Sequence, residues 1–514
     1  MLKHLSRPIH GSAGTIARHF TTAFSRRTSH ATPSEQDHVP AAPPLSRNTL
    51  LKPHLNYKNF VKNADAIADN IQNRNLKGAD IHAVAALYAQ YTTIITNLNN
   101  LRGRRNEIAA LTKAVSSPED RQPFIDEGRC IKETIQATES ELSAVEDSLL
   151  HQGLQIPNDT HPSSPIGPEL NARVLKTVGT PRTSLLAGFE LKDHVALAGA
   201  LGLVDWEAAS LVSGTSFYYL KNDAALLELA LVQYAVTRAT ARGFVPVITP
   251  DVVRTEVAYA CGFQPRTSEM SQIYDVTTAT QVADSPRLCL AGTAEIPLAG
   301  MYARKLMDER ELPVRLVGFG RAFRAEAGAR GADTRGLYRV HQFSKVELFA
   351  LTTPAKSEEM MEEIRSLQEE IFEDLGLCFS FQGLPFVLEK FSNHHLPFVS
   401  QRVLDMPTEE LGASAYRKYD IEAWMPGRNR WGEISSTSNC TDYQSRRLGI
   451  RYRPASTKRE PGVEYAHTLN GTAIAVPRII IAILENFQLA DGSVVVPEAL
   501  RSWMGGKKMI KCGA

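Results

Sequence analysis

The sequence has no long hydrophobic run. A helix needs about 18 or more consecutive apolar residues to cross a bilayer, and no such stretch occurs among the 514 residues. The nearest approach, residues 474–484, contains Pro477 and Arg478. We therefore expect no membrane span and no membrane partner. A composition of 43% hydrophobic and 22% charged residues over this length predicts a globular protein of two or more domains.

Cysteines are few and scattered. No two of the six form a Cys-x-x-Cys pair, and none stands with a histidine at the spacing of zinc ligands. The pattern predicts free thiols in a reducing compartment for Cys130, Cys261, Cys289, Cys378, Cys440 and Cys512.

Neither sign of charge is in excess over the whole chain, whose formal net charge is +1. Contact with a nucleic acid would therefore need a local basic face. The first 34 residues differ, because they contain five Lys or Arg residues and many Ser and Thr, while the first acid is Glu35. This composition is typical of a mitochondrial or plastid transit peptide, and a plain basic tail is the alternative. We expect residues 1–47 to be a transit peptide that directs the protein to the mitochondrial matrix.

The sequence also lacks a phosphate-binding glycine loop. No G-x-x-x-x-G-K-[ST] motif occurs, and the Gly318-Phe319-Gly320 segment lacks the third glycine of a dinucleotide site. If a nucleotide binds, side chains must hold much of its triphosphate. Arginine suits this role because its planar fork can donate two parallel hydrogen bonds and keeps its charge.

The N-terminal third contains two helical seams. Apolar residues follow one another at spacings of three and four in two runs: Ile81, Val84, Tyr88, Tyr91, Ile95 and Leu98, then Ile131, Ile135, Thr138, Leu142, Val145 and Leu149. Between the runs, Ser117 suits a helix cap and Pro118 a first helical position. We expect an antiparallel helical hairpin at residues 48–155, with a plain helical subdomain or a dimerisation coil as alternatives. Arg102, Arg104 and Arg105 could face phosphates.

The remainder predicts an α+β domain. Residues 156–170 are rich in Pro and Ser and indicate a linker, and helical stretches such as 224–242 then alternate with β-prone runs at 244–248, 314–319 and 346–351. We expect a mainly antiparallel sheet flanked by helices over residues 171–504, followed by a tail at 505–514.

One short stretch, residues 323–349, gathers charge. We expect a strand over 314–326, a loop over 328–336 and a returning strand over 338–349. Arg324 and Glu326 would then share one strand face. A solvated surface hairpin with salt bridges is the alternative.

Several motifs together resemble one family. "FRAEAG" followed by "GLYRVHQFSKVELF" resembles motif 2 of the class II aminoacyl-tRNA synthetases, specifically the seryl-tRNA synthetases. The stretch from Gly214 to Val253 resembles motif 1, "GTAEIPLAG" the serine-site loop, "RWGEISSTSNCTDYQSRRLGIRYR" the metal and nucleotide strand, and "HTLNGTAIAVPRIIIAILENFQ" motif 3. The likeness extends from about residue 50 to 504. It implies the class II catalytic fold with an N-terminal coiled-coil hairpin.

The resemblance implies an ATP-dependent activation of L-serine to seryl-adenylate and transfer of serine to tRNA(Ser) in mitochondrial translation. It also implies a homodimer built by motif 1, which contains Pro250, and a hairpin arm that reads the shape of the tRNA. A catalytically silent, synthetase-like RNA-binding or regulatory protein and a structural coiled-coil protein are the alternatives.

The resemblance assigns residues to each ligand. Arg324 and Arg478 match the catalytic, phosphate-binding arginines. The ATP site would comprise Arg324, Ala325, Glu326, Val340, His341, Gln342, Phe343, Glu433, Ile434, Ser435, Ser436 and Arg478, with Mg²⁺ on Glu433 and Ser436. Serine would bind Thr293, Ala294, Glu295, Arg324, Glu347, Asn470 and Thr472. Such a polar pocket should reject alanine. The roles of Arg330, Arg335 and Arg339 stay open, between closing over ATP and meeting the tRNA end.

Residues 387–401 depart from the family pattern. They interrupt a "GLPFRVL"-like segment that is continuous in the family, and "LPF" occurs both before and within them. Their codons can carry the donor, branch and acceptor signals of a short intron, in frame and roughly 45 nucleotides long, although surface loops also tolerate insertions. We hypothesise a retained intron, in which case His394 and His395 need no metal role. Sequencing the transcript tests this hypothesis.

Overall fold

The structure, a computed structural model, describes residues 51–263, 272–277, 285–326, 335–377, 400–455 and 462–512. The predicted transit peptide, Cys378, Arg330 and the histidine pair at 394 and 395 lie outside these residues. Five cysteines within them are free thiols. In this part of the chain no helix is long and apolar enough to cross a bilayer.

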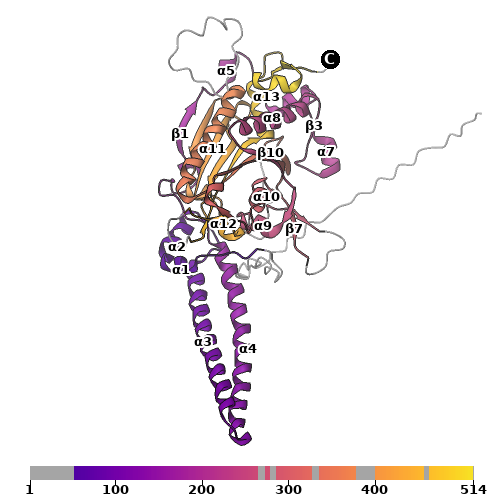
Figure 1. The fold of residues 1–514 in the computed structure, drawn as a ribbon. Helices are drawn as coiled ribbons and strands as arrows, with labels where there is room; N and C mark the ends of the chain where they lie inside the picture. The colour runs from indigo at the N-terminus through magenta and orange to yellow at the C-terminus, as the bar shows by residue number, and fades with distance from the viewer. Residues whose placement is uncertain are drawn as a thin grey trace, which may run out of the picture. The chain divides into compact units, whose positions relative to one another are not determined.

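A helical hairpin forms the N-terminal part, as predicted. Its four helices are α1 (Tyr57–Lys62), α2 (Ala64–Asn73), α3 (Ile81–Ala114) and α4 (Pro118–Gln155), and α3 and α4 lie side by side along their length (Figure 1). In α3 the seam passes through Ile94 and not Ile95, which is only half-buried. Ser117 is the N-cap residue of α4, but its side chain makes no capping hydrogen bond.

The basic cluster of α3 is mostly neutralised within the hairpin. Arg102 pairs with Glu139, and Arg104 pairs with Glu127 and Glu107. Exposed ion pairs of this kind contribute little stability, about 0–1 kcal/mol each. Their main consequence is that these two guanidinium groups already have acidic partners.

The base of the hairpin is tied to the following domain. Arg74 at the end of α2 is only 2% exposed, and its guanidinium donates to the carbonyl oxygens of Asp159, Gly412 and Ala415. The Asn158 amide donates to the carbonyl oxygen of Ser414. Residues 156–168 form no helix or strand, yet these bonds pack the expected linker against its neighbours.

An eight-stranded sheet forms the centre of the second part. Its order is β1 (Arg173–Val178), β11 (Gln401–Asp405), β12 (Arg417–Met425), β13 (Arg430–Asn439), β16 (His467–Ala475), β10 (Gln342–Thr352), β9 (Val314–Phe323) and β4 (Val245–Ile248). All neighbours pair antiparallel except β4 and β9, which are parallel. The predicted α+β class with a mainly antiparallel sheet is therefore confirmed.

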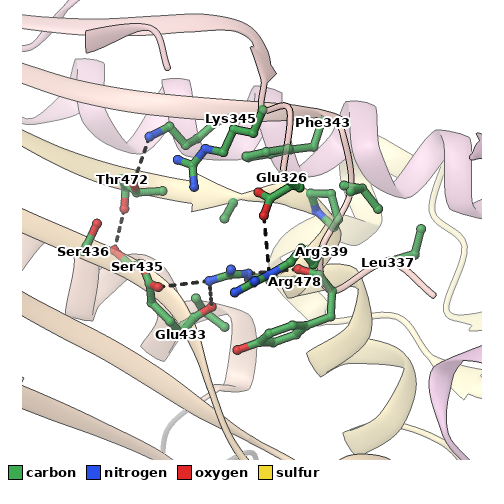
Figure 2. A pocket seen from close by; sticks show the side chains of 16 residues that line it. Glu326, Leu337, Arg339, Phe343, Lys345, Glu433, Ser435, Ser436, Thr472 and Arg478 are labelled. Atoms are coloured by element: carbon green, nitrogen blue, oxygen red, sulfur yellow. Dashed lines mark hydrogen bonds and ion pairs between the residues drawn. The ribbon is translucent and has the colours of Figure 1, made fainter. Parts of the chain in front are cut away.

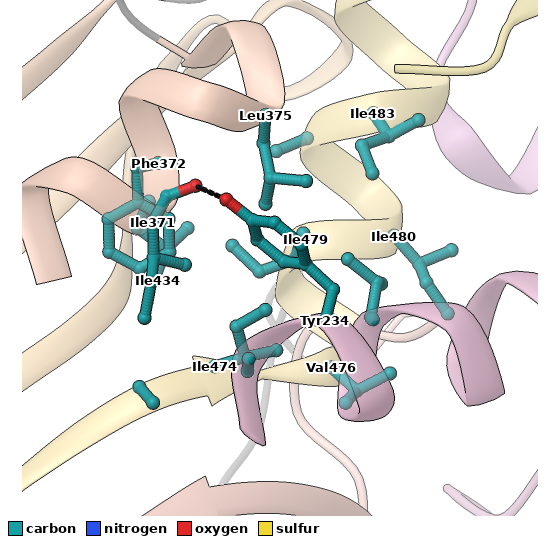
Figure 3. Close-up of a cluster of buried hydrophobic side chains, with 14 of the residues drawn as sticks. Tyr234, Ile371, Phe372, Leu375, Ile434, Ile474, Val476, Ile479, Ile480 and Ile483 are labelled. Carbon is teal, nitrogen blue, oxygen red and sulfur yellow. Dashed lines mark hydrogen bonds between the residues drawn. The ribbon is translucent and has the colours of Figure 1, made fainter. Parts of the chain in front are cut away.

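Helices cover this sheet and build the core. The helices α8 (Asn222–Ala241), α11 (Ser357–Phe372) and α13 (Val476–Asn486) contact its central strands. Figure 3 shows Tyr234 of α8 among isoleucines of α13, with its hydroxyl donating to the carbonyl oxygen of Ile371 at 3.2 Å. Burying each such side chain contributes about 1.5–3 kcal/mol, so this cluster holds α13, and the site residues at its start, against the sheet.

The remaining α-helices and strands of the described part are short. The helices are α5 (Ser184–Ala187), α6 (His194–Ala200), α7 (Trp206–Ser213), α9 (Thr255–Ala260), α10 (Glu295–Gly300), α12 (Tyr443–Leu448) and α14 (Glu498–Arg501). The strands are β2 (Val204–Asp205), β3 (Tyr219–Leu220), β5 (Val252–Arg254), β6 (Asp275–Val276), β7 (Leu288–Leu290), β8 (Leu306–Asp308), β14 (Arg451–Arg453), β15 (Glu464–Tyr465), β17 (Val494–Val495) and β18 (Met509–Ile510).

The charged hairpin differs from its prediction at both strand ends. β9 ends at Phe323 and β10 begins at Gln342, so the expectation that Arg324 and Glu326 share a strand face was wrong. The backbone amide of His341 donates to the carbonyl oxygen of Ser216 and not to β9. Glu326 takes a positive φ of 46°. The Arg324 amide still donates across the hairpin to the carbonyl oxygen of His341, and the pairing stops beyond it, where the Ala325 amide donates to the carbonyl oxygen of Gln272.

Most of residues 387–401, which depart from the family pattern, lie outside the described residues. The last of them, Gln401, is in β11. The Gln401 side chain is fully buried, and neither of its amide atoms has a hydrogen-bond partner in the described part of the chain. Removing residues 387–401 would join Phe386 to Arg402, and an apolar ring suits such a position better than an unsatisfied amide. The retained intron stays a prediction.

A candidate nucleotide and amino-acid site

A cavity opens between the ends of β9 and β10, the strand β13 and the start of α13. Its empty space, which includes open solvent, is about 570 Å³. The residues expected at ATP that line it are Arg324, Glu326, Val340, Phe343, Glu433, Ile434, Ser435, Ser436 and Arg478 (Figure 2).

Three residues expected at ATP do not line this cavity: Ala325, His341 and Gln342. The His341 ring stacks on Phe217 and its Nδ1 lies 3.0 Å from the carbonyl oxygen of Arg324. The His341 carbonyl oxygen accepts the Arg324 amide at 2.9 Å. His341 therefore orients the backbone that carries Arg324.

Arg478 lies in the first turn of α13. A cation at the positive end of a helix dipole is unfavourable unless a negative charge compensates it. Glu433 supplies that charge, since Nη1 of Arg478 donates to its Oε2 at 3.2 Å and to its carbonyl oxygen at 2.8 Å. The same helix end favours a bound anion, so Arg478 and the α13 terminus together suit a phosphate.

The electrostatics of the cavity favour an anion. Burial by itself would raise the pKa of Glu433, but the charges of Arg478, Lys418 and Arg324 hold it well below its ordinary value, so Glu433 is ionised at neutral pH. Burial and the nearby charge of Arg478 lower the pKa of Arg324. Two arginines that repel each other across the cavity would both gain from an anion between them.

Aromatic rings form two surfaces of the cavity. The guanidinium of Arg324 lies 5.4 Å from the centre of the Phe343 ring. Two guanidinium groups approach the Tyr338 ring, that of Arg428 at 3.6 Å and that of Arg478 at 4.6 Å from its centre. Such cation–π contacts stabilise the flat guanidinium orientation. Tyr338 was absent from the predicted site.

The residues expected to bind serine surround two carboxylates beside the cavity, Glu347 and Glu295, which we call the acidic group. Thr293 donates to Oε2 of Glu347 at 3.2 Å, and Lys345 pairs with the same oxygen at 2.5 Å. Nζ of Lys345 also lies 3.5 Å from Oγ1 of Thr472, which lines the cavity. Lys345 therefore connects the acidic group to the cavity.

Glu295 is the second carboxylate of this group. Its Oε1 accepts hydrogen bonds from the amides of Asn470 at 2.9 Å and Gln444 at 2.6 Å. Burial raises its pKa to about 7, and the charge of Glu347 adds to the rise, while the Gln444 bond and the charge of Lys345 act in the opposite direction. A cation arriving here would favour the ionised form. Ala294, the N-cap residue of α10, offers no polar side chain.

Prediction from sequence gave no role at the site to Tyr338, Lys345 and Gln444, and it left the role of Arg339 open. Lys345 could have been found, because it stands two residues before Glu347 on one strand and shares its face. Gln444 had no such signal, since 149 residues separate it from Glu295. Arg339 lines the cavity and lies 3.6 Å from Glu326, whereas Arg335 pairs with Asp193 at 3.9 Å.

The oxygen atoms of Glu433 and Ser436 suit a hard cation. Within the described ranges, no group of three or more His, Cys, Asp or Glu residues could hold a metal ion. Mg²⁺ does not require such a cage, because it usually keeps several waters and binds one or two carboxylates together with substrate phosphates. The donor set therefore fits Mg²⁺ delivered with a nucleotide.

Comparison with known proteins yields two family models. The model described as "tRNA synthetase class II core domain (G, H, P, S and T)" matches residues 278–487, and that of the "Seryl-tRNA synthetase N-terminal domain" matches residues 55–160. The first range contains the cavity, and the second contains the helical hairpin.

Similar curated proteins span nearly the whole chain. A serine–tRNA ligase of Treponema denticola is 43% identical over 455 residues, covering 88% of this chain and 99% of that protein. The mitochondrial serine–tRNA ligase of Schizosaccharomyces pombe is 41% identical over 468 residues and covers 89% of each chain.

Solved structures are similar over the same extent. The seryl-tRNA synthetase from Pyrococcus horikoshii, complexed with ATP, has a TM-score of 0.76 and 34% identity, covering 90% of this chain and 100% of that one. The cytoplasmic serine–tRNA ligase from Naegleria fowleri, in complex with AMP, has a TM-score of 0.71 and 30% identity and covers 90% and 99%.

Proposed function

Because the chain belongs to the seryl-tRNA synthetase family of class II aminoacyl-tRNA synthetases, we propose that it activates L-serine with ATP and transfers the serine to tRNA(Ser) in the mitochondrial matrix. The observation that carries the proposal is the convergence of Arg324, Arg478 and Glu433 on one cavity, with the acidic group of Glu295 and Glu347 beside it. A synthetase-like protein without catalytic activity would not need both the cavity residues and the acidic group.

Activation requires no protein nucleophile. A carboxylate oxygen of serine attacks the α-phosphorus of ATP, the bond to the bridging oxygen breaks, and pyrophosphate leaves. Catalysis therefore depends on alignment and on charge neutralisation. Arg324 and Arg478 would bind the phosphates, and Phe343 would stack on the adenine. Mg²⁺ held by Glu433 and Ser436 would supply further positive charge next to the phosphates.

The acidic group would select serine. Glu295 and Glu347 suit the ammonium group, and Thr293, Asn470 and Thr472 offer partners for the hydroxyl and the carboxylate. A substrate without the hydroxyl leaves buried polar groups unpaired, and sites built this way reject such an analogue by about 10⁴-fold. Alanine should therefore be a very poor substrate.

The helical hairpin would contact the tRNA. α3 and α4 have 34 and 38 residues, so at 1.5 Å per residue each extends on the order of 50 Å. Such length suits recognition of RNA by shape and backbone. Because Arg102 and Arg104 already pair with acids, phosphate contacts there would require these exposed pairs to exchange partners.

A second copy of the chain would cover an apolar surface on β4 and α8. The edge strand β4 exposes Val245 and Ile248, the latter by 88%, and α8 exposes Leu229 by 67%. Large exposed apolar side chains grouped in this way mark interfaces. Replacing Ile248 and Leu229 with lysine should shift a dimer to monomers in light scattering, and an unchanged dimer would contradict this assignment.

Mitochondrial import rests on the basic, acid-free composition of residues 1–34 and on the likeness to the mitochondrial relative of fission yeast. Residues 1–47 fused to a fluorescent protein should direct it to mitochondria. Diffuse fluorescence would argue against the proposed compartment, while leaving the proposed activity untouched.

The proposed activity is tested by isotope exchange between pyrophosphate and ATP. Exchange should depend on serine and should be near background with threonine or alanine. Charging of tRNA(Ser) by the same preparation then tests the transfer step. Absence of serine-dependent exchange would overturn the proposed function.

A further inference from the structure

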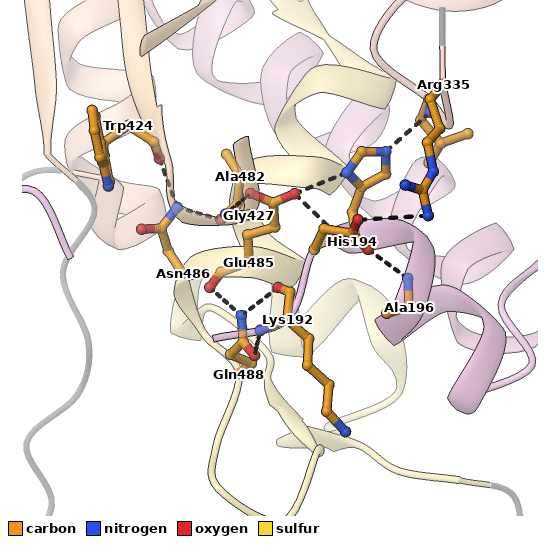
Figure 4. Close-up of polar contacts among 12 residues, drawn as sticks. Lys192, His194, Ala196, Arg335, Trp424, Gly427, Ala482, Glu485, Asn486 and Gln488 are labelled. Carbon is orange, nitrogen blue, oxygen red and sulfur yellow. Dashed lines mark hydrogen bonds and ion pairs between the residues drawn. The ribbon is translucent and has the colours of Figure 1, made fainter. Parts of the chain in front are cut away.

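A buried polar network joins four segments of the chain: the start of α6, the end of α13, the backbone at Leu337 and the turn at Gly427 (Figure 4). At its centre are His194, the first residue of α6, and Glu485 near the end of α13. Both are essentially excluded from solvent, with side chains 4% and 0% exposed. Neither residue lines the cavity, and no step of the proposed reaction uses them.

The hydrogen bonds define the state of the imidazole. The backbone amide of Leu337 donates to Nε2 of His194 at 3.2 Å, so Nε2 carries no proton. The other ring nitrogen, Nδ1, therefore carries the proton and donates to Oε1 of Glu485 at 2.8 Å. His194 thus connects the carboxylate of Glu485 to the backbone at Leu337.

Glu485 holds two further backbone groups. The amide of His194 donates to its Oε1 at 3.0 Å, and the amide of Gly427 donates to its Oε2 at 2.9 Å. Gly427 lies in the turn that joins β12 to β13, next to Arg428. One buried carboxylate therefore accepts three hydrogen bonds, and removing it would leave two buried donors of His194 and the partly buried amide of Gly427 without this partner.

The segments held by this network meet again at Tyr338. Leu337 precedes Tyr338, whose ring contacts the guanidinium groups of both Arg428 and Arg478. The carbonyl oxygen of Tyr338 also accepts from Nε of Arg478 at 3.4 Å. Arg478 and Glu485 are seven residues apart on α13, so both lie on the same side of the helix. The network therefore sets the surroundings of the arginine expected to bind phosphate.

Two glycines make room for the network. Gly336 has a φ of +75°, and a Cβ built on it would lie 2.1 Å from Nε2 of His194. A Cβ built on Gly427 would lie 2.5 Å from the Cα of Asp193 and 2.9 Å from Oε1 of Glu485. These close approaches indicate that the two backbone segments are packed directly onto the imidazole and the carboxylate.

We propose that His194 and Glu485 are positioning residues for ATP, which hold Leu337 and Tyr338 so that Arg478 is oriented toward the phosphates. The inference rests on the proposed function and adds a distant determinant of nucleotide affinity to it. In the part of the chain that the structure describes, the hydrogen bonds of the acidic group expected to bind serine involve none of the network residues, so the effect should concern ATP and not serine.

Two substitutions separate the two bonds of the imidazole. In His194→Asn the shorter amide lies near the position of Nδ1, so it keeps the bond to Glu485 and loses that to Leu337. In His194→Gln the longer amide reaches the position of Nε2 and keeps an acceptor for Leu337. We expect His194→Asn to raise the KM for ATP on the order of tenfold, as the loss of one buried hydrogen bond does. His194→Gln should stay within about threefold of wild type.

The assay is serine-dependent exchange of pyrophosphate and ATP on the full chain, with the KM for serine measured alongside and ATP binding measured by calorimetry. The KM for serine should change less than about twofold in both variants, whereas a general loss of structure would alter both KM values and the yield. Gly336→Ala tests the same contact in a second way, because the added Cβ would push the backbone away from the imidazole while His194 itself is unchanged.

The matched control is His161→Ala. His161 also accepts a backbone amide on a ring nitrogen, that of Ser163 at 3.0 Å, but it is not among the cavity residues, so its loss should leave the KM for ATP unchanged. An unchanged KM for ATP in His194→Asn, or equal effects of the Asn and Gln variants, would overturn the inference. If the wild-type chain shows no serine-dependent exchange, the proposed function fails, while ATP affinities from calorimetry still decide the role of His194.

Discussion

The carboxyl group of Glu295 should make serine use depend on pH in a predictable direction. Its pKa is raised to about 7 by burial and by Glu347. A group of this pKa is roughly one tenth ionised at pH 6 and nine tenths ionised at pH 8. The ammonium group of serine favours the ionised carboxylate, so kcat/KM for serine should rise about tenfold from pH 6 to pH 8.

The assay is the exchange reaction at saturating ATP and a series of serine concentrations, at constant ionic strength. Glu295→Gln is the control, because the amide cannot titrate although it keeps the shape of the side chain. This variant should lower kcat/KM for serine by on the order of ten- to a hundredfold, the value of a lost charge-assisted hydrogen bond.

The comparison also separates Glu295 from other titrating groups. Titration of serine itself or of the phosphates would affect the wild type and Glu295→Gln alike, so only the difference between their pH profiles reports on Glu295. A flat wild-type profile, or the same slope in both proteins, would refute the assignment of this carboxylate to the serine ammonium.

Three further predictions follow from the contacts described above. Arg478→Lys should lower the exchange rate on the order of a hundredfold or more, because lysine cannot reproduce the fork that contacts both Glu433 and a phosphate; activity within about twofold of wild type would exclude a role in catalysis. Glu433→Gln should raise the Mg²⁺ concentration needed for half-maximal exchange by about ten- to a hundredfold, seen in a magnesium titration at constant free ATP. Ile480→Ala should reduce the free energy of unfolding by about 2–5 kcal/mol in a denaturant titration, with little effect on the KM for serine of the folded protein.

Much of the fold could be predicted from local pattern. The seams of α3 and α4 follow from the spacing of apolar side chains, and the helices expected from them are present with only a shift from Ile95 to Ile94. The ends of β9 and β10 could not be predicted, because they depend on a hydrogen bond from His341 to Ser216, which are distant in sequence.

The candidate site, like the fold, could be predicted from the sequence only in part. By itself, the sequence determined the chemistry available, because the residue types in its motifs and their family resemblance place arginines, carboxylates and hydroxyls in a known order. It also determined which helices form, since amphipathic spacing is a local property. Only the tertiary structure decided which of these groups meet. Gln444 with Glu295, His194 with Leu337, and Arg478 with Glu433 are each separated by 45 or more residues, and burial in one folded core is what raises the pKa of Glu295 and fixes the proton on His194.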